Sequence, residues 1–245
     1  MTESVAQDTA APPPRASFWE DVIDIFVSPV QVFRRRENAS PWAPFLFVVI
    51  ALAVIGFATF NVIEPALAGE MRRAMTRAAA SNPRLTPELI DQSVKMQTNI
   101  AKYTGGFIFA ITLLLLGLAV WLVGKLFGSK QTFPMAMTVA SYAYFPRVLG
   151  AVVLGIQGLI MDTSGVTSMA QISISPARFM TPESASPLVM ALLLRLDVFV
   201  LWSTVLLAVG TYVTGKLSKG SAWVFGIVIW IVGGLLPILG ALRQG

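Results

Sequence analysis

Long apolar stretches without a charged residue are the feature that most constrains this chain. Residues 45–63, 104–124 and 220–242 contain no Asp, Glu, Lys or Arg. As helices they would each be about 28 to 35 Å long, which matches a hydrocarbon core of roughly 30 Å. Two further apolar stretches carry only isolated charges. The sequence therefore predicts an all-α membrane protein with five transmembrane helices, at about residues 43–64, 104–125, 133–161, 187–215 and 220–242.

Composition supports a single membrane domain over residues 38–245. Of the 245 residues, 55% are hydrophobic and 13% are charged, whereas a soluble domain carries about 25% charged residues. The net charge of +5 comes from Lys and Arg beside the spans. This pattern fits anionic lipid headgroups as partners, and we expect no nucleic-acid partner because no basic module interleaved with aromatic residues is present.

The absence of His and Cys from the sequence restricts the chemistry available to the chain. Thiolate and imidazole metal ligands and the usual general base are excluded, and no nucleophile elbow, phosphate loop or paired-carboxylate motif is found. We therefore expect no catalytic, metal or cofactor site and no enzymatic activity, and the sequence identifies no small-molecule substrate.

The N-terminal region divides into two parts. Residues 1–16 are polar and Pro-rich and lack the apolar segment of a signal peptide, so we expect a disordered leader. Residues 17–37 predict an amphipathic helix lying at the membrane interface, restarted at Ser28-Pro29. A dedicated partner-docking helix is the alternative. The expected interfacial anchors of this region are Trp19, Arg34, Arg35 and Arg36.

The connections between spans carry further signals. The first loop, residues 66–102, predicts a helical hairpin with a break at Ser81-Asn82-Pro83 and a helix start at Thr86-Pro87-Glu88. We expect this hairpin to lie on the membrane or the bundle, with a recognition element outside the bilayer as the alternative. Pro146 should kink the third span.

Three charged residues fall inside the apolar stretches. Arg195 and Asp197 are two positions apart, so on a helix they point to nearly opposite sides and cannot pair with each other. Counted from the lysine-flanked ends, Arg147 and Asp197 lie at similar depths, which predicts an intramembrane charge pair. Two alternatives to this pair remain for Asp197. The structural alternative is a hydrogen bond to a hydroxyl in a span, such as that of Ser141, and the functional alternative is a proton or ion site. Arg195 is expected to extend to the headgroups as an interfacial anchor.

Several segments resemble a known family. They are SPVQVFRRRENASPWAPFLFVV before the first span, SYAYFPRVLGAVV in the third, and LDVFVLWSTVLLAVG followed by KLSKGSAW. In this order and spacing they resemble the Yip family, the Ypt/Rab-interacting integral membrane proteins. The short Pro-rich leader and long first loop look like the prokaryotic branch. The resemblance implies five spans, a cytosolic N-terminus and a C-terminus across the membrane; eukaryotic members act in vesicle traffic with Rab GTPases and each other.

Together these features predict a non-enzymatic scaffold or adaptor in membrane organisation or trafficking. Its partners would be lipids, other membrane proteins or a second copy of itself as a homo-oligomer. The alternative is a small transporter or lipid-moving protein that uses the charges near the third and fourth spans. The positive-inside rule places the N-terminus inside and the C-terminus outside a bacterial inner membrane. The basic residues that this orientation places together on the inner side are Arg34, Arg35, Arg36, Lys125, Lys130, Lys216 and Lys219.

Overall fold

The computed structural model describes residues 16–82, 84–161, 165–181 and 185–242, and within these segments every regular element is a helix. The all-α fold predicted from the sequence is therefore confirmed. The predicted leader falls almost entirely outside the described residues. In chain order the elements are α1 (Phe18–Val27), α2 (Pro29–Arg35), α3 (Trp42–Ala58), α4 (Phe60–Ala79), α5 (Pro87–Leu126), α6 (Phe133–Ala143), α7 (Phe145–Ile160), α8 (Met169–Ile172), the 3-10 helix η1 (Pro176–Phe179), α9 (Pro187–Leu194), α10 (Val198–Gly215) and α11 (Lys219–Leu242).

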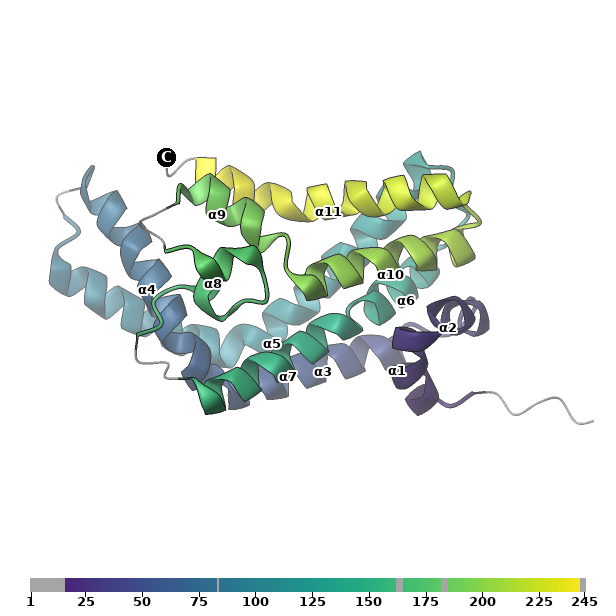
Figure 1. Ribbon diagram of the computed structural model, residues 1–245, viewed down its shortest axis with the longest axis horizontal. Coiled ribbons are helices and arrows are strands. Elements are labelled where there is room, and N and C mark those ends of the chain that lie inside the picture. The colour runs from purple at the N-terminus through teal and green to yellow at the C-terminus, as the bar shows by residue number, and fades with distance from the viewer. Residues whose placement is uncertain (1–15, 83, 162–164, 182–184, 243–245) are drawn as a thin grey trace, which may run out of the picture.

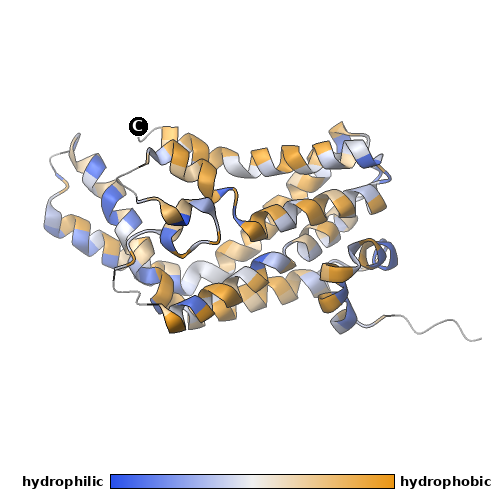
Figure 2. Ribbon diagram, viewed as in Figure 1, coloured by the Kyte–Doolittle hydropathy of each residue, from blue (hydrophilic) through white to orange (hydrophobic). Residues whose placement is uncertain are grey.

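The helices form an elongated bundle with two different ends (Figure 1). Four units within the described segments are long and apolar enough to cross a membrane: α5, the α6–α7 pair, α10 and α11. The bent pair α3–α4 makes a fifth if it is counted as one span. One end of the bundle holds α1, α2 and the α5–α6 and α10–α11 connections, and the other holds α4, the start of α5, α8 and α9. Apolar residues dominate the bundle between these ends (Figure 2).

The first span differs from its predicted bounds of 43–64. The helix α3 ends at Ala58, the chain bends by 81°, and α4 then continues through Glu64 and Pro65. At the bend, the Thr59 N–H and hydroxyl both donate to the Ile55 carbonyl at 2.8 Å, and a threonine hydroxyl that bonds back in this way often bends a helix. Pro65 lies inside α4 and does not end it.

The predicted loop helix and the second span form one continuous helix. The 40 residues of α5 extend over about 60 Å, roughly twice the hydrocarbon core. The Thr86 hydroxyl accepts from the Leu89 N–H, so the helix starts at the predicted position. The first half of α5 packs against α4 as a hairpin, joined by an Arg72–Asp91 ion pair. The predicted hairpin break includes Pro83, which lies outside the described residues.

The third and fourth spans are both broken. The helix is interrupted at Tyr144, two residues before Pro146, so that α6 and α7 are separate elements. The predicted span 187–215 consists instead of a short helix, α9, and a longer one, α10. The break occurs at Asp197 because its carboxylate caps α10, accepting from the Phe199 N–H at 2.9 Å.

Small residues allow the spans to approach one another closely. A Cβ added at Gly117 of α5 would lie 1.9 Å from the Met137 sulfur of α6, and one at Gly106 would lie 2.8 Å from Ala53 of α3. In α11, a Cβ added at Gly226 would lie 3.1 Å from Ala208 of α10, which is a tight contact. Glycine at these contacts is therefore a packing requirement, as is common between membrane helices.

Candidate functional site

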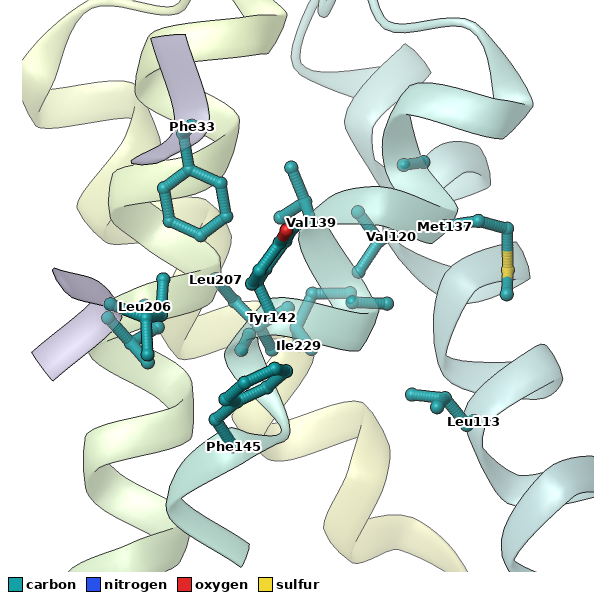
Figure 3. Packing of buried hydrophobic residues seen from close by; sticks show 14 of the residues in the cluster. Phe33, Leu113, Val120, Met137, Val139, Tyr142, Phe145, Leu206, Leu207 and Ile229 are labelled. Atoms are coloured by element: carbon teal, nitrogen blue, oxygen red, sulfur yellow. The ribbon is translucent and has the colours of Figure 1, made fainter. Parts of the chain in front are cut away.

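The two N-terminal helices dock onto the end of the bundle and form what we call the N-terminal platform, residues 18–35. Ile25, Val32 and Phe33 are buried and belong to the main hydrophobic cluster. Phe33 enters this cluster beside α10, where a Cβ added at Gly210 would lie 3.1 Å from its ring (Figure 3). The ring also meets Tyr142 of α6 edge to face. The platform is therefore part of the packed protein on one face.

A buried carboxylate fixes the platform to the third span. Asp21 is fully buried (0% exposed), and its two oxygens accept from the Arg35 and Arg36 Nε atoms, each at 2.6 Å. The Tyr142 hydroxyl donates to the same carboxylate at 2.6 Å. Asp24 accepts from Arg35 at 2.7 Å. Two positive charges and one phenol thus compensate a carboxylate that would be costly to bury alone.

This network changes the expected role of two of the three arginines. Arg35 and Arg36 turn inward to Asp21, with side chains only 25% exposed, which corrects their assignment as headgroup anchors. Partial burial alone would lower the pKa of Arg35, but the hydrogen bonds and charges of Asp24 and Asp21 outweigh it and the pKa is raised. Arg34 and Trp19 stay exposed, and their anchoring role remains a prediction.

Further polar contacts tie the chain together at the same end. Lys216 pairs with Glu37 at 2.6 Å, which links the segment after α2 to the end of α10. The buried Gln131 donates to the Thr214 hydroxyl at 2.6 Å, and the Lys130 N–H donates to the Gly215 carbonyl at 3.0 Å. These bonds satisfy polar groups that the hydrophobic surroundings would otherwise leave unpaired.

The structure does not join Arg147 to Asp197, which corrects the predicted charge pair. The Asp197 carboxylate accepts instead from three backbone N–H groups, those of Phe199, Val200 and Ile174, at 2.9, 3.2 and 3.3 Å. The break in the fourth span creates a helix N-terminus, whose free N–H groups take up the carboxylate. Arg147 lies over the ring of Tyr144, the residue before α7, 6.0 Å from the centroid.

Arg195 points into the bundle, which corrects its expected extension to the headgroups. Its guanidinium stacks 5.2 Å from the centre of the Trp230 ring in α11 and donates to the Trp230 carbonyl. The Trp230 indole N–H donates back to the Arg195 carbonyl at 3.1 Å. A Cβ added at Gly234 would lie 3.1 Å from the Arg195 Nε atom. Glycine therefore lets the guanidinium lie flat against α11.

At the opposite end, the hairpin of α4 and α5 is connected to α8. Glu70 accepts from the Ser168 hydroxyl and the Met169 N–H at 3.0 and 2.8 Å, and Arg73 donates to the Thr167 carbonyl at 2.9 Å. Two open pockets lie here, one of about 570 Å³ between α4 and α5 and one of about 470 Å³ between α4, α9 and α11. Neither is lined by Asp197. Within the described segments, no cluster of three or more Asp or Glu side chains could hold a metal ion.

Comparison with known proteins agrees with this architecture. The Yip1 domain matches residues 23–240 of the chain, and this match indicates no enzyme family. A membrane protein of Bacillus subtilis strain 168, YknW, is 26% identical over 208 residues, which cover 84% of this chain and 83% of that protein. No solved structure matches the chain. With nearly its whole length matched and four to five apolar helices able to cross a bilayer, the chain is a multi-pass membrane protein that belongs to the Yip1 domain family.

Proposed function

We propose that this protein is a non-enzymatic membrane scaffold or adaptor that acts through protein or lipid partners. The observation that carries the proposal is the hydrogen bonding of the Asp197 carboxylate. Its carboxylate accepts from three backbone N–H groups and holds the broken fourth span together. A proton or ion carrier would need a carboxylate that is free to exchange its ligand. Asp197 is thus better explained as a structural cap.

The hairpin of α4 and α5 is the surface we assign to a protein partner. The length of α5 carries it beyond a bilayer that contains the other spans. Leu89, Met96 and Ile100 are exposed at positions that share one face of α5. Exposed apolar residues on a segment outside the bilayer are typical of interaction sites. The partner is either another membrane protein or a second copy of this chain.

The N-terminal platform is assigned to the membrane surface. Opposite its buried face, Trp19, Ile23 and Val27 are exposed at a spacing of four residues along α1. Such a stripe, next to the exposed Arg34, fits the boundary between headgroups and acyl chains. We propose that this end faces the cytoplasm of a bacterial inner membrane, on the strength of the seven basic residues that flank the spans here: Arg34, Arg35, Arg36, Lys125, Lys130, Lys216 and Lys219.

Photocrosslinking in intact membranes tests the scaffold proposal. A photoreactive phenylalanine is placed at Met96 on the hairpin or at Leu115 in the apolar part of α5, since the two side chains are 58% and 59% exposed on one helix. Position 96 should yield a discrete protein adduct, and a band at twice the chain mass would identify a second copy as the partner. Position 115 should crosslink to lipid alone. No adduct from 96, or equal adducts from both positions, would contradict the proposal.

A further inference from the structure

The larger of the two pockets, about 570 Å³, lies between α4 and α5 directly after the 81° bend that follows α3. Phe60 and Glu64 line it from the first two turns of α4, and Lys95, Asn99 and Lys102 line it from α5. Within each helix these residues recur every three or four positions, so they share one face. The two faces bring both signs of charge to one cavity, whose volume is in the range of ligand sites in proteins.

The pocket lies at the level of the lipid headgroups. In α5 no charged residue occurs between Lys102 and Lys125, which are separated by about 35 Å of helix, slightly more than a hydrocarbon core of roughly 30 Å. In the first span, Glu64 is likewise the first charged residue after Glu37. Glu64 and Lys102 therefore both lie where the chain leaves the hydrocarbon on the hairpin side.

The charges of this pocket do not neutralise one another. Among the residues that the structure describes, Glu64, Lys95 and Lys102 form no ion pair with each other or with any other side chain. The Lys102 ammonium lies instead against two aromatic rings, 5.3 Å from the Phe57 centroid and 5.7 Å from the Phe60 centroid. Such contacts hold a cation in place without cancelling its charge. One carboxylate and two ammonium groups can therefore all bind a ligand.

Exposed aromatic side chains continue from the pocket toward the hydrocarbon. Tyr103 and Phe107 follow Asn99 at a spacing of four residues along α5, and both are exposed. The exposed Phe57 ring of α3 lies 6.0 Å from the Tyr103 ring. Aromatic residues at this depth pack against the region where headgroups meet acyl chains. A ligand with a charged head and an apolar tail fits this arrangement.

We propose that the pocket binds the headgroup of a phospholipid that carries a primary ammonium group, such as phosphatidylethanolamine. Lys102 binds the phosphate, and Glu64 accepts charge-assisted hydrogen bonds from the ammonium group. A purely anionic headgroup would instead place a like charge beside Glu64. This lipid site is independent of the scaffold role. Of the residues assigned to a protein partner, only Met96 also lines the pocket, and the site can be tested on the purified protein alone.

The test is a lipid titration of the purified full-length protein in a neutral detergent, with binding measured by thermal unfolding. The probes are short-chain phosphatidylethanolamine, phosphatidylcholine and phosphatidylglycerol, and soluble glycerophosphoethanolamine. Phosphatidylethanolamine should bind about tenfold more tightly than phosphatidylcholine, which has the same charges but no N–H to donate to Glu64. It should also bind more tightly than phosphatidylglycerol, which has no ammonium group, and than the soluble compound, which has no acyl chains. Equal affinities for the four probes, or tightest binding of any other probe, would overturn the proposal.

Variants at the two ends of the headgroup separate binding from misfolding. Glu64→Gln should remove the advantage of phosphatidylethanolamine over phosphatidylcholine, and Lys102→Gln should weaken all three phospholipids alike. Glu64→Lys should turn the preference toward phosphatidylglycerol, a gain that a misfolded protein would not show. As the control, Glu88→Gln removes a carboxylate from an exposed position of α5 outside the pocket and should leave the affinities unchanged. A preference for phosphatidylethanolamine that survives Glu64→Lys, or that Glu88→Gln also removes, would contradict the assignment.

Discussion

Replacing Asp21 with asparagine should detach the N-terminal platform from the bundle. The substitution keeps the size of the side chain but removes the charge that Arg35, Arg36 and Tyr142 share. Breaking a buried ion pair from one side costs about 3 to 5 kcal/mol. Both arginines keep a quarter of their side chains exposed and can regain some hydration. We therefore expect Asp21→Asn to weaken the docking of the platform by about 3 kcal/mol, the lower end of that range.

Cysteine alkylation measures this opening directly, because the chain contains no natural cysteine. In an Ile25→Cys background, the thiol lies at a fully buried position of the platform and reacts only when the platform opens. A loss of about 3 kcal/mol corresponds to an alkylation rate about 100-fold faster for Asp21→Asn in the same background. Asp24, 33% exposed, makes a single ion pair, so Asp24→Asn should cost about 1 kcal/mol or less. Equal rates for the two variants would refute the reasoning from burial.

Three smaller perturbations test other parts of the structure. In α10, Gly210→Val would place a Cβ 2.5 Å from the Val139 side chain and should lower the free energy of unfolding by about 1 to 3 kcal/mol, measured by thermal unfolding. As the control, the Cβ of Gly105→Ala meets nothing within 4 Å, so this variant should be neutral or slightly stabilising. Glu70→Gln removes the charge that caps α8 and should weaken α8 by about 1 kcal/mol, seen as faster hydrogen exchange at residues 168–172. Hydrogen bonds from its own N–H and from a threonine hydroxyl lower the pKa of the Glu88 carboxyl. The ionised carboxylate therefore stabilises the start of α5 above the unfolded pKa of about 4.3, and this stabilisation is lost as the pH falls through the lower folded pKa. Hydrogen exchange at residues 88–90, followed against pH, would report the loss.

Local signals in the sequence were sufficient for the class of fold. Uncharged apolar stretches indicated the spans, Thr86 indicated the start of α5, and Pro146 indicated a break in the third span. Each of these signals acts through the residue itself or its near neighbours, by hydration, helix capping or a missing N–H group. They required no knowledge of tertiary contacts.

The buried network could not be read in the same way. Asp21 lies among polar residues on an amphipathic pattern, which normally indicates a solvated face. Its burial depends on Tyr142, 121 positions away, and on Arg35 and Arg36. As interfacial anchors these two arginines were expected to point outward to the headgroups. A tyrosine within an apolar span is the one hint the sequence offered, because a buried phenol needs a hydrogen-bond partner.

The fourth span shows why counting depth along an ideal helix gave a wrong prediction, the pairing of Arg147 with Asp197. The count treats residues 187–215 as one straight helix, whereas the chain breaks at Asp197 and offers it three backbone donors. Local capping therefore competes with a distant arginine and prevails. The same break turns Arg195 toward α11, where glycine and tryptophan accommodate it.

The most direct test of the scaffold account is transport by the purified protein in sealed liposomes. Proton and ion flux and the redistribution of fluorescent lipids between leaflets would be followed for the natural sequence, for Asp197→Asn and for empty liposomes. The account predicts that all three give the same low rates, because Asp197 is a helix cap. Flux or lipid redistribution well above empty liposomes, abolished by Asp197→Asn, would contradict it and assign Asp197 to a transport site.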